Sequence, residues 1–170
     1  MFNSMVGYDN MVPLLAPQDV TNAETFSSYM DLKYAHRAAF IVHFGLITSA
    51  TPADSILLTV ECASVESGTE VAVDFTYRLS GALGTNTWGA VTAATSAGFS
   101  ILNAVDNVIA WIEIDPGQIV ADTAITEARY ARVSLSSPAD MTNSLCSVIG
   151  ITETRYKQTT FNSATGAASA

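Results

Sequence analysis

Apolar side chains recur at every second position along the middle of this chain, which is the period of a β-strand. Residues 69–80 show the alternation most clearly, because polar or small residues separate their apolar positions. These apolar positions are Val71, Val73, Phe75, Tyr77 and Leu79. The pattern predicts a half-buried strand with a solvated outer face.

Residues 38–47 alternate in the same way, and both of their faces are largely apolar, so we expect a central strand. The positions on one face are Ala38, Phe40, Val42, Phe44 and Leu46. Further strands are predicted at 55–63, 107–115, 127–136 and 143–154, with weaker candidates at 28–33, 88–92 and 98–102. Helix-like runs are limited to 16–28 and 119–124, where we expect at most a turn or two. About eight strands separated by turn signals predict an all-β fold, an antiparallel and jelly-roll-like β-sandwich.

The two ends of the chain lack this alternation. Residues 1–27 contain Pro13 and Pro17, which exclude a helix interior or a central strand, so we expect an extended N-terminal arm. Residues 158–170 are almost entirely Thr, Ser, Asn, Gly and Ala, and we expect a flexible C-terminal tail after a β-sandwich domain at 28–157. The arm can dock on this domain or on a neighbouring subunit. The candidate partner-binding residues are Val12, Pro13, Leu14, Leu15, Pro17, Val20, Tyr156 and Phe161.

Composition narrows the choice of partners. Charged residues make up 14% of the 170 residues, against about 25% in an average domain, so much of the surface must be neutral and a partner can cover part of it. The net charge is −9 and no basic cluster occurs, so nucleic acid is not an expected partner. The start of the chain has no secretory pattern and no apolar run is long enough to span a bilayer, so we expect no membrane association and a cytoplasmic origin.

The chain offers few residues with catalytic or metal-binding spacing. His36 is expected at the surface and His43 partly buried, while Cys62 and Cys146 are expected as buried free thiols. Sequence motifs for zinc, nucleotides and nucleophilic catalysis do not occur, and we expect no catalytic residue, no cofactor and no metal. A calcium site is a weaker alternative. Its oxygen ligands would come from Asp54, Asn103, Asp106 and Asn107, although the spacing of an EF-hand is missing.

Two further alternatives concern carboxylates and tryptophans. A hydrolase needs only two facing carboxylates, and the candidates are Glu61, Asp74, Glu113 and Asp115. The predicted strands place Glu61 and Asp74 on solvent faces, where charges are normally found. Trp88 and Trp111 are candidates for a sugar-binding platform, but core and edge packing explains aromatic residues at these positions more simply.

The fragments YMDLKYAH and ITETRY lie near the two ends of the predicted run of strands. By these fragments and by the order and spacing of the strands, residues 28–156 resemble small structural proteins of tailed-bacteriophage heads, of the decoration, cement or head-fibre kind. The resemblance implies a β-sandwich that sits on the capsid surface of the virion, binds the major capsid protein and often forms a dimer or trimer with copies of itself.

We therefore expect a virion structural protein that stabilises the head, and not an enzyme. An arm and tail that hold several subunits at once fit this role, because many weak contacts together bind tightly. The main alternative is a carbohydrate-binding or adhesion module that uses Trp88 or Trp111. A hydrolase that uses Glu113 and Asp115 is the third.

Overall fold

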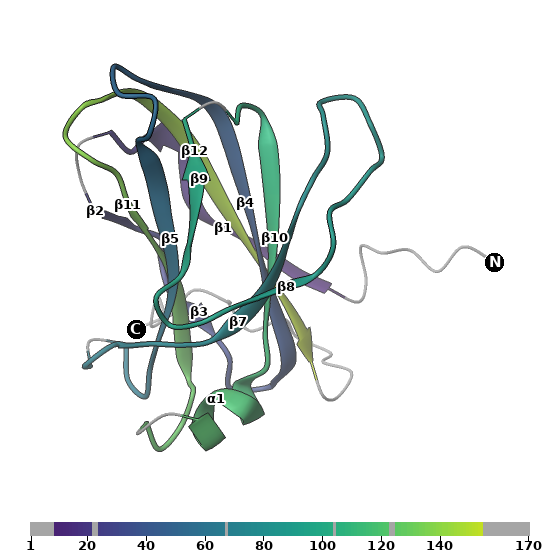
Figure 1. The fold of residues 1–170 in the computed structure, drawn as a ribbon. Helices are drawn as coiled ribbons and strands as arrows, with labels where there is room; N and C mark the ends of the chain where they lie inside the picture. The colour runs from purple at the N-terminus through teal and green to yellow at the C-terminus, as the bar shows by residue number, and fades with distance from the viewer. Residues whose placement is uncertain (1–8, 22–23, 67, 104, 123–124, 155–170) are drawn as a thin grey trace.

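The computed structural model describes residues 9–21, 24–66, 68–103, 105–122 and 125–154 of the 170-residue chain. These residues form strands and one short helix, and the strands build two facing antiparallel sheets (Figure 1). The predicted all-β antiparallel sandwich is confirmed. Twelve strands are seen in the described part of the chain where about eight were expected, because several short strands add to the predicted ones.

The first sheet has six strands, in the spatial order β1 (Asp9–Asp19), β12 (Met141–Thr154), β4 (Ala35–Ser49), β10 (Val108–Ile114), β7 (Phe75–Leu79) and β8 (Thr92–Ala94). The second sheet is ordered β2 (Glu24–Phe26), β11 (Tyr130–Ser136), β5 (Ser55–Ala63) and β6 (Val71–Ala72). Two short strands extend the second sheet: β3 (Met30–Asp31) pairs with β11, and β9 (Phe99–Leu102) pairs with β5. Helix α1 (Pro116–Asp122) lies at one end of the sandwich (Figure 1).

The core lies between the two sheets and follows the predicted alternation. In β10 the side chains that face the second sheet are all buried, namely Val108, Ala110, Ile112 and Ile114. In β11 the same holds for Ala131, Val133 and Leu135. Strand β4 is central, as expected, because it pairs with β12 on one side and with β10 on the other.

A β-bulge in β4 reverses the predicted orientation of Leu46. Phe44 pairs with Cys146 and Ile47 pairs with Ser144, so β4 has one residue more than β12 across this interval. Phe44 and Ile47 are therefore both buried, while Leu46 is 43% exposed instead of facing the core. The Asp106 carboxylate accepts a hydrogen bond from the Ile47 backbone N–H at 2.8 Å, which holds the bulge in place.

The segment 69–80 is not a single strand, as its alternation had predicted. It divides into β6 in the second sheet and β7 in the first, so the chain crosses between the sheets at Val73 and Asp74. A second crossing follows between β8 and β9. The two crossings contact each other, because the Asp74 carboxylate accepts a hydrogen bond from the Ser96 backbone N–H at 2.7 Å. Alternation persists through such a corner, so the pattern alone does not reveal it.

The second crossing depends on Gly98. Its φ of +78° lies in the left-handed region that favours glycine, and a Cβ at this position would lie 2.1 Å from the backbone oxygen of Leu58 in β5. The Gly98 N–H donates a hydrogen bond to the Thr95 oxygen at 2.8 Å and completes a tight turn. Gly98 thus allows the chain to pass close against the second sheet.

The predicted N-terminal arm is wrong for residues 9–19, which form edge strand β1 antiparallel to β12. Leu14 and Val20 are buried in the core of this domain. The turn or two of helix allowed at 16–28 is not seen in the described residues of this segment, which contribute to β1 and β2. Pro13 and Pro17 fit an edge strand because a proline has no N–H to donate to a neighbouring strand. Residues 1–8 and the predicted tail at 158–170 lie outside the described residues.

Candidate functional site

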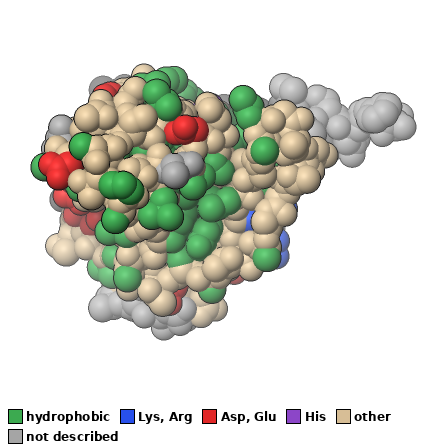
Figure 2. Space-filling model, turned by 45° about the horizontal axis from the view of Figure 1, so that its top comes forward, with side chains coloured by type: hydrophobic (Ala, Val, Ile, Leu, Met, Phe, Trp, Pro, Cys, Tyr) green, Lys and Arg blue, Asp and Glu red, His purple; other side chains and the backbone are tan. Residues whose placement is uncertain are grey.

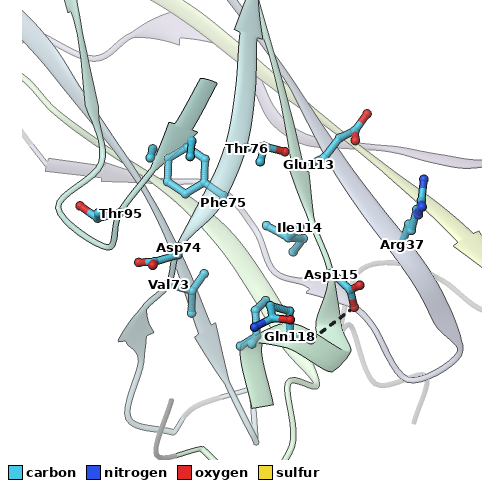
Figure 3. Close-up of a pocket in the computed structure, with 13 residues that line it drawn as sticks. Arg37, Val73, Asp74, Phe75, Thr76, Thr95, Glu113, Ile114, Asp115 and Gln118 are labelled. Carbon is cyan, nitrogen blue, oxygen red and sulfur yellow. Dashed lines mark hydrogen bonds between the residues drawn. The ribbon is translucent and has the colours of Figure 1, made fainter. Parts of the chain in front are cut away.

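A pocket of about 450 Å³ opens beside helix α1, between β7, β8 and β10 (Figure 3). Buried apolar side chains form part of its wall, among them Val73, Phe75 and Ile119. Three of the four carboxylates that the sequence suggested for a hydrolase line this pocket. The charged lining residues are Asp74, Glu113, Asp115 and Arg37.

Each of these carboxylates already has a local hydrogen-bond donor. Asp115 caps the N-terminus of α1, because its Oδ1 accepts hydrogen bonds from the backbone N–H groups of Gly117 at 2.8 Å and Gln118 at 3.4 Å. Glu113 accepts from the Trp111 Nε1 at 2.9 Å. In Figure 3 Asp74 lies on the opposite side of the pocket from Asp115, and the Glu113 carboxylate points away from both. The pocket therefore presents separate acidic acceptors around apolar walls.

The fourth carboxylate candidate, Glu61, lies in an ionic cluster on the second sheet. Its Oε2 accepts from the Arg132 Nε at 2.8 Å, and Arg132 also lies 3.3 Å from Glu70. Tyr29 donates a hydrogen bond to Glu70, and desolvation together with this bond raises the pKa of Tyr29 to about 12. The same bond lowers the pKa of Glu70. The cluster connects β5, β11 and the segments beside β3 and β6, which gives Glu61 a structural role.

The two tryptophans named as a possible sugar platform lie together. Trp111 lies on the outer face of β10, and Trp88 is brought back to it by the loop between β7 and β8, with ring centroids 6.5 Å apart and planes at 88°. Arg78 of β7 is the register partner of Trp111. Its guanidinium carbon lies 4.7 Å from the Trp88 ring centroid and 5.7 Å from that of Trp111, so both rings make cation–π contacts.

Arg78 is a member of this aromatic cluster that the sequence analysis missed. Its position on the polar face of the 69–80 alternation was a usable signal, because that face lies beside the outer face of the neighbouring strand. The partner of Trp111, however, depends on which strand lies next to β10, and strand order is not contained in a local pattern.

An apolar row crosses the outer face of the first sheet. Successive register partners from β1 to β10 are Pro13, Ile149, Ile41 and Trp111, and we call these four residues the outer row. Pro13 is exposed and the other three are partly exposed. Four apolar side chains therefore lie next to one another on the face that is turned away from the core.

The candidate partner-binding residues of the N-terminal segment do not all remain available. Pro13 and Pro17 are exposed on β1, Val12 and Leu15 are half-buried, and Leu14 belongs to the core, as does Val20. The other two candidates, Tyr156 and Phe161, lie outside the described residues. The accessible part of the predicted set is thus the proline-containing side of β1, which continues into the outer row.

Both histidines are exposed, so the expectation that His43 is partly buried is wrong; it lies on the outer face of β4. Cys62 and Cys146 are free and buried, as predicted, and burial raises the pKa of each thiol to about 12. Thiols that are protonated and buried in this way pack as small apolar side chains.

The residues suggested for calcium have structural partners. Asp106 binds the Ile47 N–H at the β-bulge, and Asp54 accepts a hydrogen bond from the Ser49 hydroxyl. In the part of the chain that the structure describes, no three His, Cys, Asp or Glu side chains are grouped so as to hold a metal ion. Within the same residues no helix is long and apolar enough to cross a membrane.

Comparison with known proteins gives few matches. No protein-family model matches the chain, and no curated protein matches it. Among solved structures the chain is similar to "Structure of infectious bursal disease virus Gt strain", with 11% sequence identity and a TM-score of 0.23. The match covers 84% of this chain and 39% of that chain.

Proposed function

We propose that this chain is a virion structural protein that binds the lattice of the major capsid protein and stabilises the head, as decoration or cement proteins do. The structural observation that carries the proposal is the outer row, which offers an apolar docking surface on a sheet that hydrogen bonds hold in shape. The resemblance of residues 28–156 to tailed-phage head proteins supplies the kind of partner.

The preformed sheet suits this role energetically. Binding through residues that are already ordered costs less conformational entropy than the ordering of a free arm. The exposed prolines of β1 extend the outer row toward the edge of the sheet without offering a backbone N–H, so β1 favours side-chain contact over strand addition. The capsid contact is therefore a face of the sandwich, where the sequence analysis had expected an arm.

The first test of the proposal is the protein composition of purified particles. Particles purified from the natural source of the chain should contain it in a fixed ratio to the major capsid protein, as measured by quantitative mass spectrometry. Absence of the chain from purified particles would refute the proposal.

The second test is reattachment to particles that lack the chain. Ile149→Glu places a charge in the outer row and should abolish co-sedimentation with these particles, because a buried unpaired charge opposes binding. Leu57→Glu is the matched control, since Leu57 is 37% exposed on the outer face of the second sheet. Deletion of residues 1–20 is unsuitable because it removes β1 from the first sheet.

We also propose carbohydrate binding as a second candidate function, on the observation that Trp88 and Trp111 lie together at the surface. Arg78 lies over the ring of Trp88, and the residue as a whole is 38% exposed. A glycan array should then give a signal that Trp88→Ala removes. A protein that only binds the capsid lattice should give no saccharide-dependent signal.

A further inference from the structure

One long part of this acidic chain carries no charge. All 16 acidic and 7 basic residues lie outside residues 79–105, which run from Leu79 to Val105 between Arg78 and Asp106. This stretch contains β8, β9 and the loop that joins β7 to β8. We call the surface formed by the described residues of 79–105 the neutral side.

The neutral side is one side of the sandwich and not a scattered set of residues. Strand β8 ends the first sheet beside β7, and the turn at Gly98 leads from it to β9, which pairs with β5 in the second sheet (Figure 1). The ring of Phe99 in β9 stacks on that of Tyr77 in β7, with centroids 3.8 Å apart. Leu79 and Phe99 pack against the core but remain partly exposed. The loop that joins β7 to β8 projects from the body of the molecule (Figure 1), and we call it the projecting loop. Figure 2 shows hydrophobic side chains gathered in a hollow between the body and this loop.

Large apolar side chains are exposed on the neutral side. Residues 82–93 are exposed throughout. Leu83 is 77% exposed, Val91 69% and Leu102 52%. A standard protein interface takes about 20–30 residues from each partner, so a neutral stretch of this length is large enough to supply one.

The projecting loop is held in a defined shape. The Thr85 N–H donates to the Ala82 oxygen at 3.0 Å, and Gly84 has a φ of +80°, so residues 82–85 form a type II turn with Leu83 at its tip. The Gly89 N–H donates to the Leu79 oxygen at 2.8 Å, and Trp88 is held by Arg78. An apolar tip on an ordered turn binds without a large loss of conformational entropy.

The edge strands of the sheets also differ in their charge and proline content. Edge strand β1 carries Pro13 and Pro17, and Asp19 lies at its end, while β2 begins with Glu24. Prolines and charges at sheet edges prevent other chains from adding to them. Edge strand β8, with sequence Thr92–Ala94, has neither. Its described pairing is with β7 alone, which leaves its other edge open.

We propose that two copies of this chain associate through the neutral side, with β8, β9 and the Leu83 turn in the interface. Each copy carries a net charge of −9, so two copies repel each other wherever their acidic residues face. The neutral side contributes no charge to this repulsion, and it exposes Leu83, Val91 and Leu102 for apolar contact. The inference rests on the proposed function in one respect, because it names the surface by which that virion protein self-associates.

The test is the oligomeric state of the full chain, measured by analytical ultracentrifugation and light scattering. The native chain should form a closed dimer, and rising salt should tighten it because salt screens the repulsion between acidic copies. The double variant Leu83→Asp, Val91→Asp should raise the dissociation constant at least about 30-fold, as expected for loss of central apolar contacts. Both side chains are highly exposed, so the variant should fold and keep the native circular-dichroism spectrum.

Val65→Asp is the matched control, since Val65 is 61% exposed in a loop outside the neutral side. It should leave the dissociation constant unchanged. A monomeric native chain at all salt concentrations, an unchanged oligomer in the double variant, or an equal loss in Val65→Asp would each overturn the inference. A monomer that still joins particles refutes only the self-association, whereas an oligomer missing from particles refutes only the virion role.

Discussion

Replacement of Gly98 by alanine tests how the chain passes from the first sheet to the second. At a φ of +78° an alanine costs about 1–2 kcal/mol, because its Cβ approaches the following carbonyl. The Cβ would also lie 2.1 Å from the Leu58 oxygen and 2.7 Å from the Thr59 Cγ2. Leu58 is fixed between two register partners, Leu135 and Phe99, so β5 does not move aside without breaking pairs. Overpacking of this kind adds about 1–3 kcal/mol.

Gly84→Ala is the matched control for this prediction. Gly84 has nearly the same φ, +80°, but no heavy atom lies within 4 Å of an added Cβ. Both variants lose the same unfolded-state freedom, so the difference between them isolates the close approach to β5.

The assay is urea unfolding followed by near-ultraviolet circular dichroism. Gly98→Ala should lower the free energy of unfolding by about 2–5 kcal/mol and Gly84→Ala by about 1–2 kcal/mol. In a chain of this size each kcal/mol corresponds to about 2–4 °C in Tm. Equal losses in the two variants would refute the argument that Gly98 is needed for space as well as for its backbone angle.

Two further predictions concern β1 and the buried thiols. Leu14→Ala should lower the free energy of unfolding by about 2–5 kcal/mol because Leu14 is a core residue. Met11→Ala, at a position 56% exposed, should change it by less than about 0.5 kcal/mol. Equal effects in urea unfolding would mean that β1 is not part of the fold. Burial raises the pKa of Cys62 and Cys146 from 9.0 to about 12, so the thiols ionise first in the unfolded chain. The free energy of unfolding should therefore fall as the pH rises from about 9 toward 12. A Cys62→Ala, Cys146→Ala variant should lose that part of the pH dependence.

The sandwich could be predicted from the sequence because burial on one face imposes a period of two that is visible residue by residue. It holds throughout β10, and in β11 its one exception is Ser134, which is buried on the outer face. The predicted alternation failed at Leu46, since the β-bulge that shifts it is fixed by Asp106, a residue far away in the sequence. It also failed to mark the sheet crossing at Val73 and Asp74, where the chain turns without losing its period.

The candidate surfaces were less predictable for the same reason. Trp88 and Trp111 could be named individually, but their contact through Arg78 requires the order of β7 and β10 in the sheet. The proline-containing segment at Val12–Val20 was correctly recognised as apolar. Its position in the fold was not predictable, because an apolar extended segment can pair with a sheet edge of its own domain as readily as it can bind a partner.

The position of β12 between β1 and β4 has a consequence for synthesis on the ribosome. Val148 pairs with Val42, and Ile151 pairs with Met11, so both pairings join residues more than a hundred positions apart. While the nascent chain is incomplete, β1 has no neighbour and β4 presents an open apolar edge. Such long-range closure slows folding and prolongs exposure to aggregation, and we expect chaperone dependence to end only once β12 has emerged.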